Sequence, residues 1–390
     1  MEPVFASSLR QQKMTNNSFT TTLLRWYAEN GRELPWRGTC DPYAIWLSEV
    51  ILQQTRIAQG WEYWERFMQR FPTVGDLASA SEDEVLRLWQ GLGYYSRARN
   101  LHFAARQIVA NGKFPETLDD IKRLKGVGDY TAAAIASMAF GLPAAVVDGN
   151  VYRVLARYFG IETPINSTEG KKLFATLAQS LLSDDQPAAF NQAMMDFGAI
   201  QCTPQSPRCL VCPLQETCAA LREGRTETLP VKIKTVKIKT RRLTYIYIRC
   251  NGETAIRRRP VGDIWAGLWE PPQASSDSLP VSLSPSLKDN VAGVPASVSF
   301  PIEEGEGDCL AENVCWEKLL NGASGLSLLR KGVKHVLTHR ILLADFYLWE
   351  TENKPPLPSE YIWIDENDLD TYAKPRLIEK LIESLPPSLR

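Results

Sequence analysis

Four cysteines fall within one short stretch of the chain, and this stretch limits how the chain folds more than any other feature. Six, two and five residues separate Cys202, Cys209, Cys212 and Cys218, with prolines at 204, 207 and 213 between them. Thiols this close together suit a metal centre, because disulfides are rare in cytosolic proteins. The spacing leaves open a tetrahedral zinc ion or a cubane iron–sulfur cluster. The other cysteines are scattered, and we expect ordinary thiols at Cys40, Cys250, Cys309 and Cys315.

The pattern of apolar residues changes after this cluster, which predicts two domains within the 390 residues. Before it, helical spacing predicts helices at 41–54, 81–89 and 170–182, the first with Asp41 as N-cap and Pro42 as its first residue. From Arg242 on, alternation around Asn251-Gly252 predicts a hairpin over 242–259. Further strands are expected at 335–350 and 360–365, helices near 316–320 and 374–384, and a long loop over 271–300.

Composition is that of a folded soluble protein, with 44% hydrophobic and 23% charged residues. Gly141 and Pro143 break the longest weakly charged run, and the N-terminus has no signal pattern, so we expect a cytoplasmic protein without a membrane partner. Residues 1–17 are expected to be a flexible extension. Lys and Arg gather in 226–242, which we interpret as a basic linker; its VKIKTVKIKT repeat also fits a strand with a lysine face.

A glycine-containing turn, Lys125-Gly126-Val127-Gly128, leads into a run of small residues that begins near Tyr130. Two glycines one residue apart allow close approach of a ligand to the backbone, and the amides at a helix start suit a phosphate. An ordinary turn has the same residues, so this motif gains meaning only from its neighbours.

Two carboxyls have surroundings that suit acid chemistry. Glu49 has the apolar Ile45, Trp46 and Leu52 at helical spacing, and a carboxyl in such surroundings has a raised pKa, as a general acid needs. The alternative is a Glu49 that faces water or pairs with Arg56. Asp148 starts the segment DGNVYRV and is equally suited to capping the helix that follows, a role open to Asn150 as well.

Together these motifs resemble those of the MutY branch of the endonuclease III superfamily of DNA glycosylases. The resemblance rests on LSEVILQQT at 47–55, VDGNVYRV at 147–154, the glycine turn and the order of the four cysteines, and it covers 18–225 and, more weakly, 241–385. It implies an all-α glycosylase domain at 18–225 with a helix-hairpin-helix at 119–141. It also implies a [4Fe–4S] loop at 202–218, held by the four cysteines, and an α/β Nudix-like domain at 243–390.

The resemblance also implies a mechanism of base removal. Glu49 would protonate N7 of a flipped-out adenine, Asp148 would stabilise the sugar cation, and Tyr130 and Asn150 would orient Asp148 and the sugar. Tyr130 stands where the lyase branch of the superfamily carries its Schiff-base lysine. A tyrosine forms no Schiff base, so the implied enzyme releases the base without cutting the strand.

DNA contacts are implied at further matching positions. Tyr94 and Gln54 match residues that enter the base stack beside the lesion, and flipping costs a few kcal/mol that such wedges partly offset. Lys125 stands where relatives usually have proline. The alternatives are that Tyr94 is a core residue, that Gln54 is a surface amide, and that Arg32 and Arg37 are surface arginines. The positions expected at the DNA are Arg32, Arg37, Leu52, Gln54, Tyr94, Lys125, Gly126, Val127 and Gly128.

The second half carries GDIWAGLWEPP at 262–272, which resembles the Nudix-like domain of the same family, but no Nudix hydrolase motif follows it. Leu337, Thr338 and His339 align with the Phe-Ser-His that touches 8-oxoguanine in relatives. Leu337 therefore stands in place of the phenylalanine and lacks its aromatic ring, whereas Thr338 keeps the hydroxyl of the serine. His339 is retained, although a histidine packed within the sheet is the alternative reading.

We therefore expect a monomeric adenine glycosylase of the bacterial cytosol that acts on double-stranded DNA with an A:8-oxoguanine or A:G mispair. A mismatch glycosylase for thymine or uracil on the same scaffold is the enzymatic alternative. An inactive iron–sulfur module that only binds DNA is the other alternative.

Overall fold

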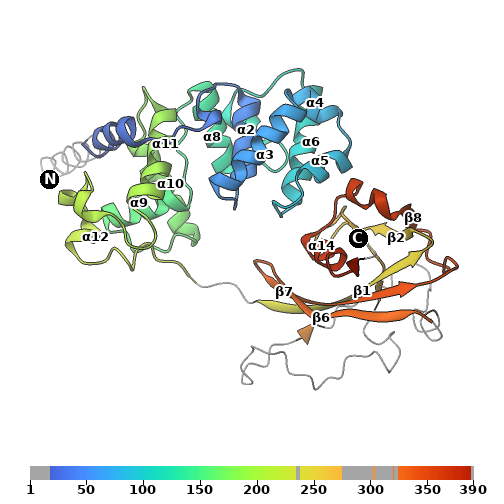
Figure 1. Cartoon of the computed structure of the whole chain (residues 1–390). Coiled ribbons are helices and arrows are strands. Elements are labelled where there is room, and N and C mark those ends of the chain that lie inside the picture. Colours follow the sequence, from blue (N-terminus) through green and yellow to red (C-terminus); the bar gives the residue numbers. More distant parts are fainter. Residues whose placement is uncertain (1–17, 234–237, 275–301, 304–318, 320–323, 388–390) are drawn as a thin grey trace, which may run out of the picture. The chain divides into compact units, whose positions relative to one another are not determined.

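The computed structural model describes residues 18–233, 238–274, 302–303, 319 and 324–387. Contacts divide the chain into two units: unit 1 is Met1–Ala80 with Asn100–Lys234, and unit 2 is Ser81–Arg99 with Thr235–Arg390. Figure 1 shows the helical ribbons of the first half and the strands of the second. No described helix is long and apolar enough to cross a membrane.

Unit 1 is all-helical in its described part, as predicted. A helix runs through residues 18–30. The elements that follow are η1 (Pro35–Arg37), α2 (Pro42–Leu52), α3 (Ile57–Arg70), α4 (Val74–Ser79), α6 (Ser96–Ala110), α7 (Leu118–Lys122), α8 (Asp129–Phe140), α9 (Gly149–Phe159), α10 (Thr168–Leu181), α11 (Pro187–Asp196), η2 (Phe197–Gln201), η3 (Cys209–Val211), η4 (Gln215–Thr217) and α12 (Ala219–Arg222).

Side-chain caps fix where these helices begin. The Asp41 side chain accepts a hydrogen bond from the Tyr43 amide at 3.0 Å and Pro42 opens α2, so the predicted start of this helix is confirmed. Ser167 caps α10 in the same way through the Gly170 amide. The helix at 18–30, α9, α10 and α11 bury one shared apolar core, formed by residues such as Phe19, Leu155, Phe174, Phe190 and Phe197.

The predicted hairpin between helices is α7, a short turn and α8. Gly126 in this turn has φ of +79°, and a Cβ there would lie 2.6 Å from Cβ of Asn100. Glycine is therefore required by both the left-handed backbone and the close approach.

Unit 2 contains a mixed sheet in the order β3-β2-β1-β7-β6, with β4 and β5 also paired to β1 and β8 to β2. α14 (Arg376–Ile382) packs on one face through Leu377, Ile378 and Leu381, against inward residues of β1 and β7. The strands are β1 (Lys239–Cys250), β2 (Glu253–Arg258), β3 (Trp269–Glu270), β4 (Gln273–Ala274), β5 (Ile302–Glu303), β6 (Leu326–Val336), β7 (Arg340–Glu350) and β8 (Tyr361–Asp365).

Most predicted elements of unit 2 are present, with three differences. The hairpin around Asn251-Gly252 is confirmed, as are β8 and the helix near 374–384. The stretch 335–350, expected to form strand, contains the end of β6 and all of β7, because the chain turns at 337–339, where the Leu337 amide donates to the Arg340 carbonyl. β4 begins inside the expected loop at 271–300, whose remainder, like the expected helix near 316–320 and the extension at 1–17, lies outside the described residues. β1 takes up the end of the predicted linker.

Segment Ser81–Arg99, which holds α5 (Glu82–Leu88), groups with unit 2 rather than with the helical domain assigned from the sequence. The Arg258 guanidinium pairs with Glu82 and Asp83 at 3.2 and 2.8 Å. The segment was assigned by its helical pattern, which does not reveal long-range ion pairs.

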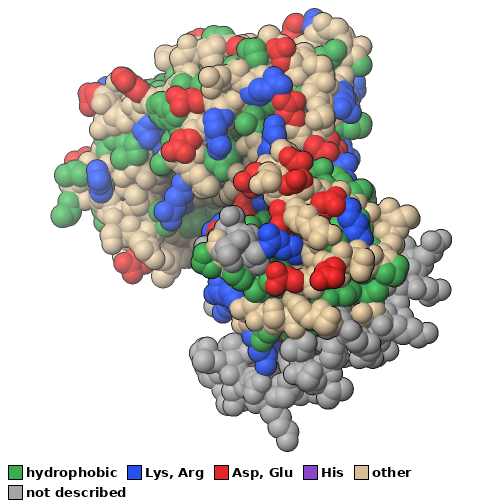
Figure 2. All heavy atoms as spheres, turned by 45° about the vertical axis from the view of Figure 1, so that its right-hand side comes forward, with side chains coloured by type: hydrophobic (Ala, Val, Ile, Leu, Met, Phe, Trp, Pro, Cys, Tyr) green, Lys and Arg blue, Asp and Glu red, His purple; other side chains and the backbone are tan. Residues whose placement is uncertain are grey.

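Charge is evenly mixed on the face drawn in Figure 2, where Lys and Arg side chains stand among Asp and Glu side chains. The net charge is −1. Because nonspecific DNA affinity comes from neutralising phosphates, any DNA contact on this face is expected to be local.

Candidate active site

The two predicted catalytic carboxyls come from separate segments that meet in unit 1. Glu49 lies in α2, which packs against α8, and Tyr130 is the second residue of α8. Asp148 directly precedes α9. The Glu49 carboxyl interacts with both the Tyr130 hydroxyl and the charge of Asp148. The structure therefore places Glu49, Tyr130 and Asp148 at one site.

Glu49 is buried, with 6% of its surface exposed, so it neither faces water nor needs Arg56 as a partner. The pKa of Glu49 is raised from 4.5 to about 7, chiefly by burial and also by the charge of Asp148. A hydrogen bond with Tyr130 and the charge of Arg37 lower it in part. Glu49 therefore holds a proton at neutral pH in a substantial fraction of molecules.

Asp148 serves as a helix cap within the same site. Its Oδ1 accepts a hydrogen bond from the Val151 amide and its Oδ2 accepts one from Asn150 Nδ2, both at 2.8 Å. Burial raises the pKa of Asp148, although these hydrogen bonds oppose the rise. The helix-terminal surroundings expected for Asp148 are present, but burial outweighs them in the direction of the pKa.

The Tyr130 hydroxyl lies near two groups, the Glu49 carboxyl and the Met195 sulfur. It is within reach of the Glu49 carboxyl and lies 3.5 Å from the Met195 sulfur. Burial, with the neighbouring carboxyls, raises the pKa of Tyr130 well above its usual value, so the phenol stays neutral. Its one proton goes to Glu49 when that carboxyl is ionised, because a carboxylate is the stronger acceptor.

Arg32 and Arg37, expected at the DNA, both bind the fully buried Asp196. Arg37 Nη1 donates to Asp196 Oδ2 at 2.7 Å, and the Arg32 Nε donates to Oδ1 at 2.8 Å. Burial would raise the pKa of Asp196, but the two arginines lower it below its usual value. Asp196 holds Arg37 near Glu49 and was missed by sequence reasoning, because these residues meet only in the folded chain.

Arg153 connects Asn150 to the cysteine loop. Its Nη2 donates to Asn150 Oδ1 and its Nε donates to the Cys202 carbonyl, each at 2.8 Å. Gly198 packs closely here, since a Cβ on it would lie 2.5 Å from Cβ of Asn150. Arg153 lies inside the motif VDGNVYRV, which was the available signal, but its part in holding Asn150 was not predicted.

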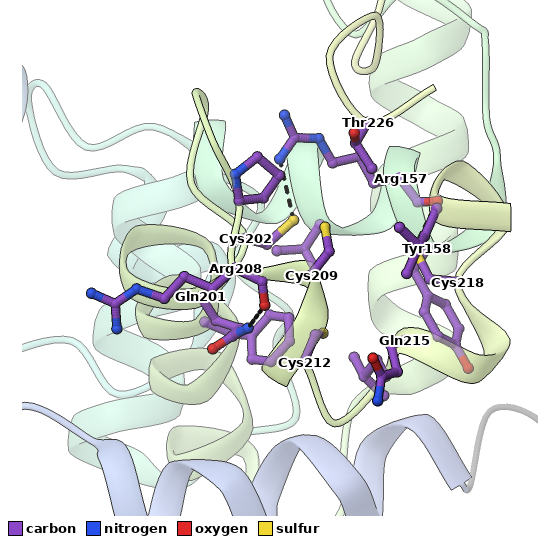
Figure 3. A pocket seen from close by; sticks show the side chains of 15 residues that line it. Arg157, Tyr158, Gln201, Cys202, Arg208, Cys209, Cys212, Gln215, Cys218 and Thr226 are labelled. Atoms are coloured by element: carbon purple, nitrogen blue, oxygen red, sulfur yellow. Dashed lines mark hydrogen bonds between the residues drawn. The ribbon is translucent and has the colours of Figure 1, made fainter. Parts of the chain in front are cut away.

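The four clustered cysteines line one apolar cavity in unit 1 (Figure 3). Burial, together with the charges of the neighbouring thiols, raises the pKa of Cys212 to about 11. Arg157 Nη1 donates to Cys202 Sγ at 3.4 Å, which supplies positive charge to this donor set. Four thiols around one cavity fit a thiolate-bound centre, although no three His, Cys, Asp or Glu side chains among the described residues form a group that could hold a single metal ion.

Gln54 and Tyr94, expected to enter the base stack, both have an unusual backbone conformation. Their φ angles are +60° and +47°, in the left-handed region that favours glycine, and both side chains are exposed. Strain of this kind concentrates at functional sites. Leu52, which ends α2, is partly buried.

In the hairpin turn, Lys125, Gly126 and Gly128 are exposed and the Val127 side chain is buried. The Lys125 amide is bonded to Gln107 Oε1 at 2.8 Å. Gly128 directly precedes α8 in extended conformation, so the start of this helix lies at the surface.

In unit 2, Leu337, Thr338 and His339 form the turn between β6 and β7. Thr338 and His339 are exposed and Leu337 is partly buried, so His339 is not a core histidine. The Tyr94 hydroxyl is hydrogen-bonded to Thr338 Oγ1. Two positions assigned separately to the DNA therefore meet within unit 2.

Two models of known protein families match separate parts of the chain. Residues 47–179 match the model of HhH-GPD superfamily base excision DNA repair proteins, and residues 244–384 match the NUDIX domain. The predicted fold class, helical glycosylase plus Nudix-like domain, is confirmed.

Two curated relatives from distant organisms have the same name. An adenine DNA glycosylase of Mus musculus is 45% identical over 227 residues, 55% of this chain and 44% of that protein. One of Buchnera aphidicola subsp. Acyrthosiphon pisum is 34% identical over 259 residues, 66% of this chain and 74% of that protein. A solved thermostable thymine-DNA glycosylase has 31% identity and a TM-score of 0.51, over 55% of this chain and 99% of that chain.

The match spans less than half of the mouse protein's length but nearly three quarters of the Buchnera protein's length. The residues that match the HhH-GPD model, 47–179, include Glu49, Tyr130 and Asp148. The chain belongs to the family of adenine DNA glycosylases.

Proposed function

We propose that this protein hydrolyses the N-glycosidic bond of adenine mispaired with 8-oxoguanine or guanine in double-stranded DNA. The observation that carries the proposal is the pair of carboxyls in one site, a buried Glu49 with a pKa of about 7 and the helix-capping Asp148. Two carboxyls in different surroundings divide the acid and the stabilising roles between them.

In this mechanism the adenine leaves the base stack and its N7 receives the Glu49 proton. Protonation makes adenine a neutral leaving group. Asp148, oriented by Asn150, faces the positive charge that develops on the sugar, and water completes hydrolysis to an abasic site. Arg37, held by Asp196, places a positive charge near Glu49 that lowers the pKa of this acid in part and so favours release of its proton.

We propose that the enzyme does not cleave the strand. Tyr130 is at the start of α8, where a lyase needs an amine, and a phenol forms no Schiff base. Thymine is the alternative target, favoured by the likeness to the thymine-DNA glycosylase.

We propose that unit 2 reads the base opposite the adenine. Tyr94 and Thr338 are bonded to each other and both are exposed, so a base placed beside one side chain lies near the other. Strained exposed residues such as Tyr94 suit insertion beside a base.

The proposed function is tested with single-turnover assays on duplexes that differ only in one base pair. We expect adenine release from A:8-oxoguanine and A:G, intact strands until alkali is added, and no borohydride-trapped enzyme–DNA adduct. Release of thymine from T:G duplexes without adenine release would favour the alternative target. DNA binding without release of any base would favour an inactive binding module.

We propose that Cys202, Cys209, Cys212 and Cys218 hold a [4Fe–4S] cluster, for which the thiol set around one cavity is suitable. When bound, such a cluster cross-links the loop and stiffens it. The loop carries Arg208 and contacts Arg153 through the Cys202 carbonyl, so its stiffness bears on Asn150 as well.

For the cysteine site we expect purified protein to be yellow-brown, with iron and acid-labile sulfide in about equal amounts. Cys212→Ser is expected to lower iron content, stability and DNA affinity, whereas Cys40→Ser, at an exposed thiol outside the cavity, serves as the control. Metal analysis and absorption spectra measure the result. One zinc per chain without iron would refute the cluster.

A further inference from the structure

Trp265 is presented by the surface loop that joins β2 to β3, and its backbone is strained. Its φ is +59°, in the left-handed region, and its side chain is partly exposed. For a bulky side chain such a conformation is a genuine outlier. Backbone strain persists only where the surrounding structure enforces it, and it concentrates at functional sites.

The loop is fixed by a buried guanidinium. Arg259 donates from Nε to the Ile264 carbonyl at 2.9 Å, and its other nitrogens bind Asp263 and the buried Glu270. Its guanidinium also lies 5.9 Å from the centre of the Trp265 ring. These contacts hold the loop on both sides of Trp265, so the ring is presented in one orientation.

The ring contacts the end of β6, just before the turn that bears Thr338. Its centre is 5.5 Å from that of His335 in an edge-to-face contact, and Trp265 packs in the same cluster as Leu337. From the other side, Arg99 Nη1 donates to the carbonyl of Ala266. Arg99 and Tyr94 belong to one segment, and Tyr94 is bonded to Thr338. The loop that carries Trp265 therefore contacts both the strand that precedes Thr338 and the segment that carries Tyr94.

We propose that Trp265 is a specificity-determining residue that contacts the nucleotide opposite the target adenine through its indole ring. This inference rests on the proposed function of unit 2 as a reader of that nucleotide. The turn itself supplies a leucine, a threonine and a histidine. Trp265 adds a large π-face to them, and a purine such as 8-oxoguanine offers a large matching surface.

The stacking contribution sets the expected size of the effect. An aromatic side chain stacked on a base contributes a binding energy that corresponds to roughly a 5- to 150-fold change on removal. The contact involves the opposite base and not the adenine. Its loss should therefore lower the preference for A:8-oxoguanine over A:G and leave the pH dependence of excision unchanged.

The test compares Trp265→Leu, Trp265→Phe and Trp269→Leu in the full-length protein. Trp269 is the matched control, since it lies four residues further on in β3 and packs edge-to-face on Tyr372, with ring centres 5.1 Å apart. Single-turnover excision is measured on A:8-oxoguanine and A:G duplexes, with thermal unfolding as the measure of folding. We expect Trp265→Leu to lower the rate ratio at least about fivefold, Trp265→Phe to retain most of it, and Trp269→Leu to retain it in full.

An unchanged ratio in Trp265→Leu would overturn the inference while leaving the proposed function intact. An equal loss in Trp265→Leu and Trp269→Leu would overturn it too, because the effect would then arise from the fold of the loop. Should the wild-type protein release adenine equally from both duplexes, the reading role of unit 2 itself fails. The double variant Trp265→Leu with Leu337→Phe adds a positive readout, since a ring restored in the same cluster should recover part of the ratio.

Discussion

Glu49→Gln is expected to bind mispaired DNA normally and to lose adenine release by at least about 10³-fold, within the range of general acid catalysis. Glutamine preserves the shape of the side chain and can still bond to Tyr130, but it has no proton acidic enough to transfer to N7. Single-turnover excision and gel-shift affinity, measured on one A:8-oxoguanine duplex, separate the two effects. Near-normal excision by this variant would exclude Glu49 as the acid.

Thermal unfolding of the same variant gives a second test of the raised pKa of Glu49. The pKa of Glu49 is about 7 in the folded protein and 4.5 in ordinary surroundings. At pH 4 the carboxyl is therefore mostly protonated in both the folded and the unfolded state, and its ionisation does not lower the stability of the fold. As pH rises from 4.5 to 7 the unfolded chain loses the proton first, and the folded state becomes less stable by about 3 kcal/mol. Glutamine removes this effect. Glu49→Gln should therefore unfold at a higher temperature than the wild type at pH 8 and at a similar temperature at pH 4.

The pH dependence of wild-type excision follows from the same group. Only protonated Glu49 donates, so the rate should fall tenfold per pH step above about pH 8, with a midpoint near the pKa of about 7. In acid the rate should fall again as Asp148, whose pKa burial raises, takes up a proton and loses its charge. A slope that persists in Glu49→Gln would assign the titration to another group.

Local features were predictable from the sequence because neighbouring residues determine them. Asp41 and Pro42 mark the start of α2, and the apolar residues around Glu49 at helical spacing indicate its burial. The hairpin at Asn251-Gly252 follows from alternation and turn chemistry in the same way. Matching motifs then placed Glu49, Tyr130 and Asp148 in one pocket.

Features that depend on distant contacts were not predictable. Asp196 lies more than 150 residues from Arg32 and Arg37, so nothing local indicates that it holds both. Segment 81–99 has the pattern of any exposed helix, and contacts with residues far away in the sequence, such as Arg258 and Thr338, tie it to unit 2.

Asp148→Asn is expected to keep the fold and lose adenine release by about 10³-fold or more, comparable to the loss of one strong electrostatic contact at a transition state. Asparagine is as good an N-cap as aspartate, so it can still accept from the Val151 amide and start α9. It lacks the negative charge that stabilises the sugar cation. The variant thus removes the proposed chemical role of Asp148 and retains its structural one.

Two further variants separate these roles completely. Asp148→Ala should lose activity to the same extent and in addition lose about 1 kcal/mol of stability, since the cap is removed. Ser167→Ala removes an equivalent cap at α10, where the serine accepts from the Gly170 amide at 2.9 Å, and should cost similar stability while leaving excision unchanged. Single-turnover rates and thermal unfolding are measured for all three. If Asp148→Asn excises adenine at the wild-type rate while Asp148→Ala is merely less stable, Asp148 is a helix cap alone, and the positive charge on the sugar must be stabilised by another group.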